Sequence, residues 1–113
     1  MIIEIWQLKP GHPCRFIGTG HGEENVISQG GPHKEDYDFI WEDYHDRKVE
    51  AGDEFGISCI LEDIFYKYNM EIPEGYTGHS LSVSDIVVLK DTTNKEYVYF
   101  VDSFGFKKVE WKK

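Results

Sequence analysis

Cysteine and long apolar runs are both scarce in this sequence of 113 residues, whose only cysteines are Cys14 and Cys59. Secreted domains that depend on disulfide bonds usually carry more cysteines, so a disulfide scaffold is not predicted, although one bond is compatible with the sequence. Cys59 falls within an apolar helical pattern and is expected to be a buried, inert thiol, whereas Cys14 is a candidate for an exposed one. No apolar run approaches about 18 residues, so no membrane-spanning helix is predicted.

Basic residues are also few. The chain has 12 Lys and Arg against 21 Asp and Glu, which gives a net charge of −9. This charge repels phosphate backbones and anionic lipids, and it argues against non-specific binding to nucleic acid or to a membrane surface. Glu4 stands near the start of the chain, where a secretory signal would need basic residues and a long apolar segment, so we expect a cytoplasmic protein.

The residue spacings that are typical of metal and nucleotide sites are missing as well. The scattered metal-binding types match neither a zinc finger nor an HExxH helix; they are His12, Cys14, His21, His33 and His45. The glycine-rich segment 18–22, GTGHG, lacks the Gly-Lys-Ser/Thr ending with which a Walker loop holds phosphate. We therefore predict no metal and no cofactor.

The chain does contain enough apolar surface for one packed domain. Hydrophobic residues make up 40% of the sequence and aromatic residues 15%. A chain of this length buries roughly two thirds of its unfolded surface when it folds. There is no internal repeat, so we expect a single domain over residues 1–113.

One helix is predicted from the spacing of apolar residues. They recur at i, i+3, i+4, i+7, i+8 and i+11 and form one stripe: Ile57, Ile60, Leu61, Ile64, Phe65 and Tyr68. Asp53 is the predicted N-cap, and Asn69 with Pro73 is expected to end the helix.

Five segments rich in β-branched and aromatic residues are predicted to be strands. They are residues 2–8, 37–44, 86–90, 97–101 and 107–111. Residues 37–44 also fit a helical period, but their aromatic content and short length favour a strand. The glycine-rich residues 18–34 are predicted to be a surface loop with room for one helical turn at 23–28. The fold class is therefore α+β, an antiparallel sheet of about five strands with one main helix on one face.

The predicted hairpin of 86–90 and 97–101 has two apolar faces. If Leu89 pairs with Val98, one face carries Val87, Leu89, Val98 and Phe100, and the other carries Ile86, Val88, Tyr99 and Val101. A half-solvated sheet would alternate apolar with polar residues, so both faces are expected to be covered. The helix would cover one, and a loop, a partner or a second copy would cover the other.

The same register predicts a polar site at the end of this hairpin. Asp85 and Asp102 would face each other with Cβ atoms about 5 Å apart, which requires compensation of their charges. In the structural interpretation each carboxylate caps a turn. In the functional interpretation, the two carboxylates and their neighbours bind a ligand or move a proton. The residues of this site would be His79, Ser80, Ser82, Asp85 and Asp102. No residue is assigned a catalytic role.

The negative charge is concentrated in one part of the chain. Residues 23–63 contain 13 acids and 3 bases, a net of −10, and the other residues contain 8 acids and 9 bases, a net of +1. Such a run is usually a solvated face, but it can also steer a basic partner or mimic DNA. Mimicry needs carboxylates as dense as the phosphates of a duplex, about one charge per 1.7 Å of axis, and gathered on one face.

Several stretches occur in the order of the motifs of a known family. They are IWQLK (5–9), YDFIW (37–41), LEDIFYKYN (61–69), Pro73, Tyr76, GHSLSVSDIVVL (78–89) and YFVDSFGF (99–106). Over nearly its whole length the chain thus resembles the YodL-like domain family, uncharacterised proteins of Firmicutes often encoded on plasmids and conjugative elements. The resemblance implies an accessory role in a mobile element or its host cell, and it brings no established activity or catalytic residue.

These observations favour a small cytoplasmic module that binds a protein or regulates one over an enzyme. The second apolar sheet face and the acidic segment 23–63 would be its contact surfaces, and a second copy of the chain is one candidate partner. One alternative is a small-ligand or enzymatic site at His79, Asp85 and Asp102. Another is an acidic DNA mimic that acts against restriction enzymes.

Overall fold

The structure, a computed structural model, describes residues 1–20, 22–49 and 52–112. Its elements in chain order are β1 (Ile2–Leu8), the 3-10 turn η1 (Lys34–Asp36), β2 (Tyr37–Tyr44), α1 (Glu54–Met70), β3 (Ile86–Lys90), β4 (Glu96–Val101) and β5 (Phe106–Val109). His21 of the predicted loop and Glu50 of the acidic segment lie outside the described residues.

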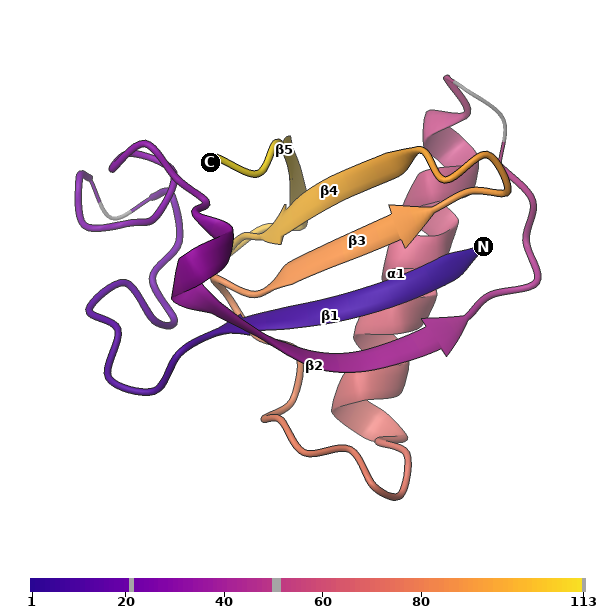
Figure 1. The fold of residues 1–113 in the computed structure, drawn as a ribbon, viewed down its shortest axis with the longest axis horizontal. Coiled ribbons are helices and arrows are strands. Elements are labelled where there is room, and N and C mark those ends of the chain that lie inside the picture. Colours follow the sequence, from indigo (N-terminus) through magenta and orange to yellow (C-terminus); the bar gives the residue numbers. More distant parts are fainter. Residues whose placement is uncertain (21, 50–51, 113) are drawn as a thin grey trace.

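The strands form one antiparallel sheet in the order β2-β1-β3-β4-β5. Helix α1 crosses behind the sheet and covers one of its faces (Figure 1). The predicted α+β class is therefore confirmed. β1 lies between β2 and β3, so the first residues of the chain form a central strand of the sheet.

Helix α1 follows its predicted limits. The Asp53 side chain caps it by accepting a hydrogen bond of 2.9 Å from the Gly56 amide. The apolar stripe is buried against the sheet except for Phe65, whose side chain is 43% exposed. Within the described part of the chain, no helix has the length and apolar character needed to cross the hydrocarbon layer of a membrane.

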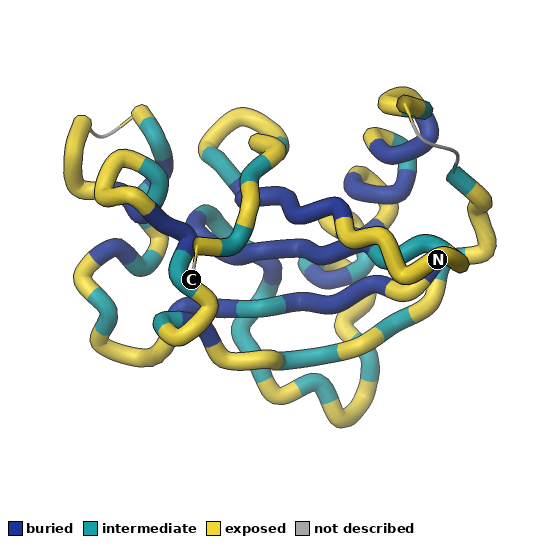
Figure 2. The backbone as a smooth tube through the Cα atoms, turned by 45° about the horizontal axis from the view of Figure 1, so that its top comes forward, coloured by how far each residue is buried: buried dark blue, intermediate teal, exposed yellow. Residues whose placement is uncertain are grey.

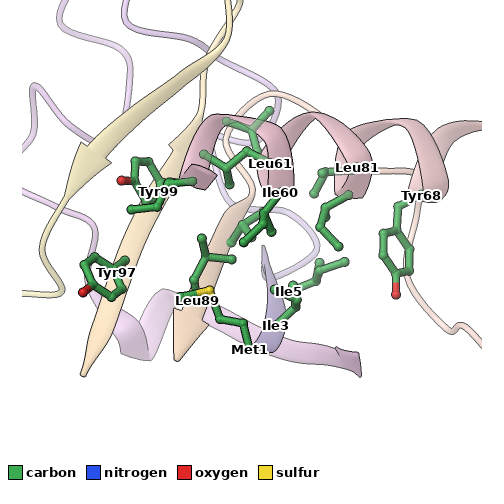
Figure 3. Close-up of a cluster of buried hydrophobic side chains, with 14 residues drawn as sticks. Met1, Ile3, Ile5, Ile60, Leu61, Tyr68, Leu81, Leu89, Tyr97 and Tyr99 are labelled. Atoms are coloured by element: carbon green, nitrogen blue, oxygen red, sulfur yellow. The ribbon is translucent and has the colours of Figure 1, made fainter. Parts of the chain in front are cut away.

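The main core fills the space between α1 and the sheet. Figure 3 shows side chains from the helix, from β1 and from β4 converging there, among them Ile60, Ile5 and Tyr99. Leu81, from the segment before β3, closes the same cluster and is 1% exposed. The helix is thus held by long-range apolar contacts as well as by its own periodicity.

A second core covers the opposite face of the sheet. Ile86, Val88 and Phe100 lie there beneath Cys14 and Val26 of the long loop between β1 and β2. Figure 2 shows the middle of the sheet as a buried band, with exposed loops around it. The expectation that this face is covered is confirmed, but the chain itself covers it, so it is not available as a contact surface for a partner.

The two cysteines are placed the other way round from the prediction. Cys14 is buried in the second core, and burial raises the pKa of its thiol. Cys59, on α1, is only partly buried. Both thiols are free. The prediction was wrong for Cys14 because the loop that carries it packs onto the sheet instead of running through solvent.

The predicted register of the hairpin is wrong by one residue. Val98 pairs with Val88 and not with Leu89. The cause lies in the turn, where the Asp91 carboxylate accepts hydrogen bonds from the amides of Thr93 and Lys95 and so holds Asp91 in the loop. A shift of one residue exchanges the faces of one strand relative to the other. Val87 and Leu89 therefore share the helix side with Tyr97, Tyr99 and Val101.

Two boundaries also differ slightly from the prediction. β4 begins at Glu96, and β5 covers Phe106–Val109 instead of residues 107–111. The chain leaves the sheet after Val109 because Lys112 donates its amide to the Pro32 carbonyl oxygen at 2.8 Å. In the described part of residues 18–34 no α-helix is present, but a turn lies close to the predicted 23–28, with one helix-type hydrogen bond of 3.2 Å from the Gln29 amide to the Asn25 carbonyl oxygen.

One hydroxyl links α1 to β2. The Tyr68 hydroxyl donates to the Asp43 carboxylate at 2.6 Å, and Lys67 donates to the same oxygen at 2.8 Å. Burial disfavours the charged form of Asp43, but these hydrogen bonds outweigh it and hold the pKa of its carboxyl below the usual value. We expect Tyr68→Phe to lower the free energy of unfolding by about 1–2 kcal/mol and to raise the pKa of Asp43.

Urea unfolding and an NMR titration of Asp43 would measure both effects. Tyr66→Phe is the matched control, because that hydroxyl belongs to an exposed side chain on the same helix. Equal stability of the two variants would show that the hydroxyl of Tyr68 contributes nothing.

Candidate functional site

A buried polar cluster is centred on Gln7 of β1, which is 2% exposed. Its amide nitrogen donates to the His79 carbonyl oxygen at 2.9 Å and to Asp85 Oδ2 at 3.1 Å. Its amide oxygen accepts from the His79 backbone amide at 3.2 Å. The approach requires a glycine at position 78, since a Cβ there would lie 2.4 Å from Gln7 Oε1. Gln7 thus ties the segment before β3 to the central strand.

The hydrogen bonds of His79 define where its proton lies. Nδ1 is 2.7 Å from the Ser80 carbonyl oxygen, and a carbonyl oxygen can only accept, so Nδ1 carries the hydrogen. In the neutral ring Nε2 is then an acceptor. It lies 3.7 Å from Asp85 Oδ1, which is also an acceptor when ionised. At this distance the two atoms form no hydrogen bond, and Nε2 has no other partner among the described residues.

Asp85 is the most deeply placed carboxylate of the cluster and is 1% exposed. Its Oδ2 accepts from the Ser82 amide at 2.8 Å and from Gln7, whereas Oδ1 has no hydrogen-bond partner among the described residues. Burial raises the pKa of Asp85 well above its usual value, against the opposing effects of Ser82, Gln7 and Arg15. The carboxyl group therefore holds its proton to higher pH than a solvated aspartate.

The serines organise the turn that leads into β3. Ser80 supplies the carbonyl oxygen that accepts from His79 and also from the Ser82 hydroxyl at 2.7 Å. Ser84 adopts a positive φ of 84°, and its hydroxyl accepts from the Phe16 amide at 2.9 Å. The Phe16 ring in turn packs on the His79 imidazole with centroids 4.9 Å apart. The loop at Phe16 thus covers the cluster.

Asp102 belongs to a different set of contacts. The sheet register places Phe100 opposite Ile86, so Asp85 and Asp102 do not face each other. The Asp102 carboxylate accepts from the amide and the hydroxyl of Thr19 and from the Ser103 amide. Burial opposes its ionisation, but these hydrogen bonds hold its pKa below the usual value. Asp102 ties the loop at Thr19 to the turn after β4.

Of the predicted site residues, His79, Ser80, Ser82 and Asp85 are thus brought together, and Asp102 is engaged separately. Gln7 completes the cluster and was not predicted, and neither was the effect of the Arg15 charge on Asp85. Gln7 could have been found from its position, since a strand that buries Ile3 and Ile5 on one face places Gln7 on the same face. A polar side chain at such a position needs a buried partner. Arg15 lies in an irregular loop and carries no such signal.

The surface cavities described by the structure lie elsewhere. One, of about 490 Å³, separates α1 from the turn between β4 and β5. We call it the α1 groove, and it is lined by Glu62, Phe65, Tyr66, Asn69, Met70, Asp102, Ser103, Gly105 and Phe106. Neither His79 nor Asp85 lines it. Because His79 and Asp85 do not line this cavity, a ligand bound there would not reach them. This geometry does not favour the small-ligand or enzymatic alternative.

Metal-binding side chains do not gather in the described residues, where no three of His, Cys, Asp and Glu are placed to hold an ion. His21, one of the five scattered residues considered above, lies outside the described part. His12 and His45 instead lie near single carboxylates, Asp36 and Asp63.

The comparison with protein families covers nearly the whole molecule. The family model described as the YodL-like domain matches residues 2–111. The chain belongs to the YodL-like domain family. Searches of curated proteins and of solved structures found no match.

The acidic segment of this YodL-like domain is spread over the molecule. Figure 1 shows the loop 22–30 at one end, β2 along one edge and the start of α1 at the other end. Three of its carboxylates also lie beside basic side chains: Asp43 beside Lys67, Asp63 beside His45, and Asp36 beside His12. Carboxylates placed on several sides cannot reproduce the continuous charge of a duplex, so the DNA-mimic alternative loses its structural basis.

Proposed function

We propose that this YodL-like domain is a cytoplasmic protein-binding module with a regulatory, accessory role in a plasmid, a conjugative element or its host cell. The observation that carries the proposal is the α1 groove together with the exposed aromatic residue beside it. The resemblance to a family often encoded on mobile elements supports the biological setting.

The groove has the composition of a protein-binding site. Phe104, between two of the lining residues, is 99% exposed, and Met70 on the opposite side is 70% exposed. Phe65 and Phe106 form the apolar base, with their rings at 88° to each other and centroids 6.2 Å apart. Large apolar side chains that gather beside a cavity mark interaction sites, because burying them in a partner is favourable.

The charges around the groove indicate the chemistry of the partner. Its lining contains the carboxylates of Glu62 and Asp102 and, among the residues described, no cation. A second copy of a chain with net charge −9 would be repelled. We therefore expect a partner segment that has apolar residues for the groove and Lys or Arg residues on either side of them, such as a basic amphipathic helix.

Selection from a library of random peptides displayed on phage would test this proposal with the full chain as the target. The expected ligands combine apolar residues at helical spacing with flanking basic residues. Met70→Glu should weaken their binding at least tenfold, about 1.4 kcal/mol, because it places a carboxylate within the apolar lining.

Phe55→Glu is the matched control, since Phe55 is equally apolar and 74% exposed but lies in the first turn of the same helix. It should leave peptide binding unchanged. Equal loss in both variants, or selected peptides with no basic bias, would contradict the proposal. A dimer that Met70→Glu dissociates in analytical ultracentrifugation would identify a second copy as the occupant and overturn the assigned partner.

A further inference from the structure

The edge of the sheet has a notch where β5 is shorter than β4. β4 covers Glu96–Val101, but its pairing with β5 stops at Val98, opposite Val109. Beyond Val109 the chain turns away towards Pro32. On this side of β4, the N–H and C=O groups of Glu96 therefore have no strand partner among the described residues, whereas those of Tyr97 point the other way, to Leu89 of β3. Unpaired strand backbone is a template for another extended segment.

A cavity of about 650 Å³ occupies this notch. Its apolar base includes Tyr97, Val98 and Trp111. Four lysines also line it, namely Lys34, Lys95, Lys108 and Lys112. These are a third of the 12 basic residues of the chain, gathered at one place on a protein whose net charge is −9.

Aromatic rings hold three of these ammonium groups close to the cavity. Lys34 Nζ lies 4.8 Å from the centroid of the Trp6 ring and 5.8 Å from that of Trp111. The Nζ atoms of Lys95 and Lys108 lie 5.2 and 5.9 Å from the centroid of the Tyr97 ring. Within the described residues none of the four lysines forms an ion pair with a carboxylate. Their charge is therefore available to a ligand.

We propose that the notch binds an acidic peptide segment of a partner protein, which adds to the free edge of β4 as a short strand. The main chain of the segment exchanges hydrogen bonds with the free N–H and C=O groups of Glu96, and its carboxylates meet Lys95 and Lys108. The site is independent of the α1 groove, which adjoins the turn at the other end of β4.

A peptide fits the notch better than a nucleic acid does. Glu35, Glu96 and Glu110 also line the cavity and would repel a continuous row of phosphates. A peptide carries separate charges and backbone groups that can pair with a strand. Short strands and lysines also protect sheet edges against aggregation, but that role does not need a cavity of this size beside the edge.

Binding of a synthetic peptide that alternates valine and glutamate would test the proposal on the full chain. The expected result is measurable binding that weakens as salt is added, with NMR shifts at Glu96 and Tyr97. Combined Lys95→Glu and Lys108→Glu should reduce affinity at least tenfold. Lys9→Glu with Lys48→Glu is the matched control of equal charge, because both lysines are exposed and lie outside the notch.

The strand mode has a test of its own. Methylation of alternate peptide amides removes the donors that would pair with β4 and should reduce affinity at least tenfold. The proposal would be overturned if affinity were unchanged after methylation or if the two double-lysine variants lost affinity equally. It would also be overturned if a valine–lysine peptide bound equally well or if single-stranded DNA bound more tightly. The absence of binding at a peptide concentration of about 1 mM would also overturn it, because a dissociation constant of that size corresponds to a binding free energy of about −4 kcal/mol. Met70→Glu should not change this binding, so failure here and failure of the α1 groove are distinguishable.

Discussion

Phe100→Ala is expected to lower the free energy of unfolding by about 3–5 kcal/mol, a large part of the roughly 5–15 kcal/mol that holds a domain of this size together. Phe100 is 0% exposed and lies in the second core, beneath the loop that carries Cys14 and Val26. Removing its ring leaves a cavity that the flanking strands cannot close, since both belong to a paired sheet. Urea unfolding followed by far-UV circular dichroism would measure the loss.

The control is the same substitution four residues later. Phe104 is 99% exposed, so Phe104→Ala should change the free energy of unfolding by less than about 0.5 kcal/mol. A small effect of Phe100→Ala would mean that the second face of the sheet is not a packed core. In that case the face would again be a candidate contact surface.

Asp85→Asn should make the protein increasingly more stable than the wild type as pH rises above about 4. Burial raises the pKa of Asp85 in the folded state, so the folded state binds its proton more tightly than the unfolded state does. The stability that Asp85 contributes is fully present below its unfolded pKa, about 3.9, and is lost as pH rises through the folded pKa. Asparagine does not ionise and removes that loss.

The hydrogen bonds of Asp85 permit this replacement. A side-chain oxygen of asparagine can accept from Ser82 and Gln7 in place of Oδ2, and its amide would replace Oδ1, which has no hydrogen-bond partner to lose among the described residues. Each unit that separates the folded and unfolded pKa values amounts to about 1.4 kcal/mol in favour of the variant at high pH. Urea unfolding from pH 4 to pH 8 would measure the difference.

Asp102→Asn is the matched control with the opposite sign. The hydrogen bonds from Thr19 and Ser103 lower the pKa of Asp102. Its contribution to stability is therefore present above the unfolded pKa and disappears as pH falls through the folded one. Changes of the same sign in both variants, or a loss in Asp85→Asn that does not depend on pH, would show that Asp85 is ionised in the folded state.

The elements of this fold were predictable because their causes are local. The stripe from Ile57 to Tyr68 and the Asp53 cap define α1 within the chain segment that forms it. The apolar character of both faces of β3 and β4 likewise required that each face be covered. The family was also predictable, since its motifs run through nearly the whole chain.

The candidate site was predictable only in part. The turn before β3 brings His79, Ser82 and Asp85 together because they are close in sequence. Their partner Gln7 is 78 positions away from Asp85, and only the pairing of β1 with β3 brings it there. Asp102 was misplaced because the register depends on how Asp91 closes a turn, and apolar patterns on both faces fit either register equally well.

Residue order alone thus determines the helix, the strands and the need to cover both sides of the sheet, because hydrophobic periodicity and capping act over a few residues. The folded arrangement decides which segment covers the second face, which residue completes the polar cluster and where the α1 groove and the lysine-lined notch lie. Those outcomes depend on contacts between segments far apart in the chain. Such contacts form only if the free energy of packing outweighs the entropy lost in bringing the segments together.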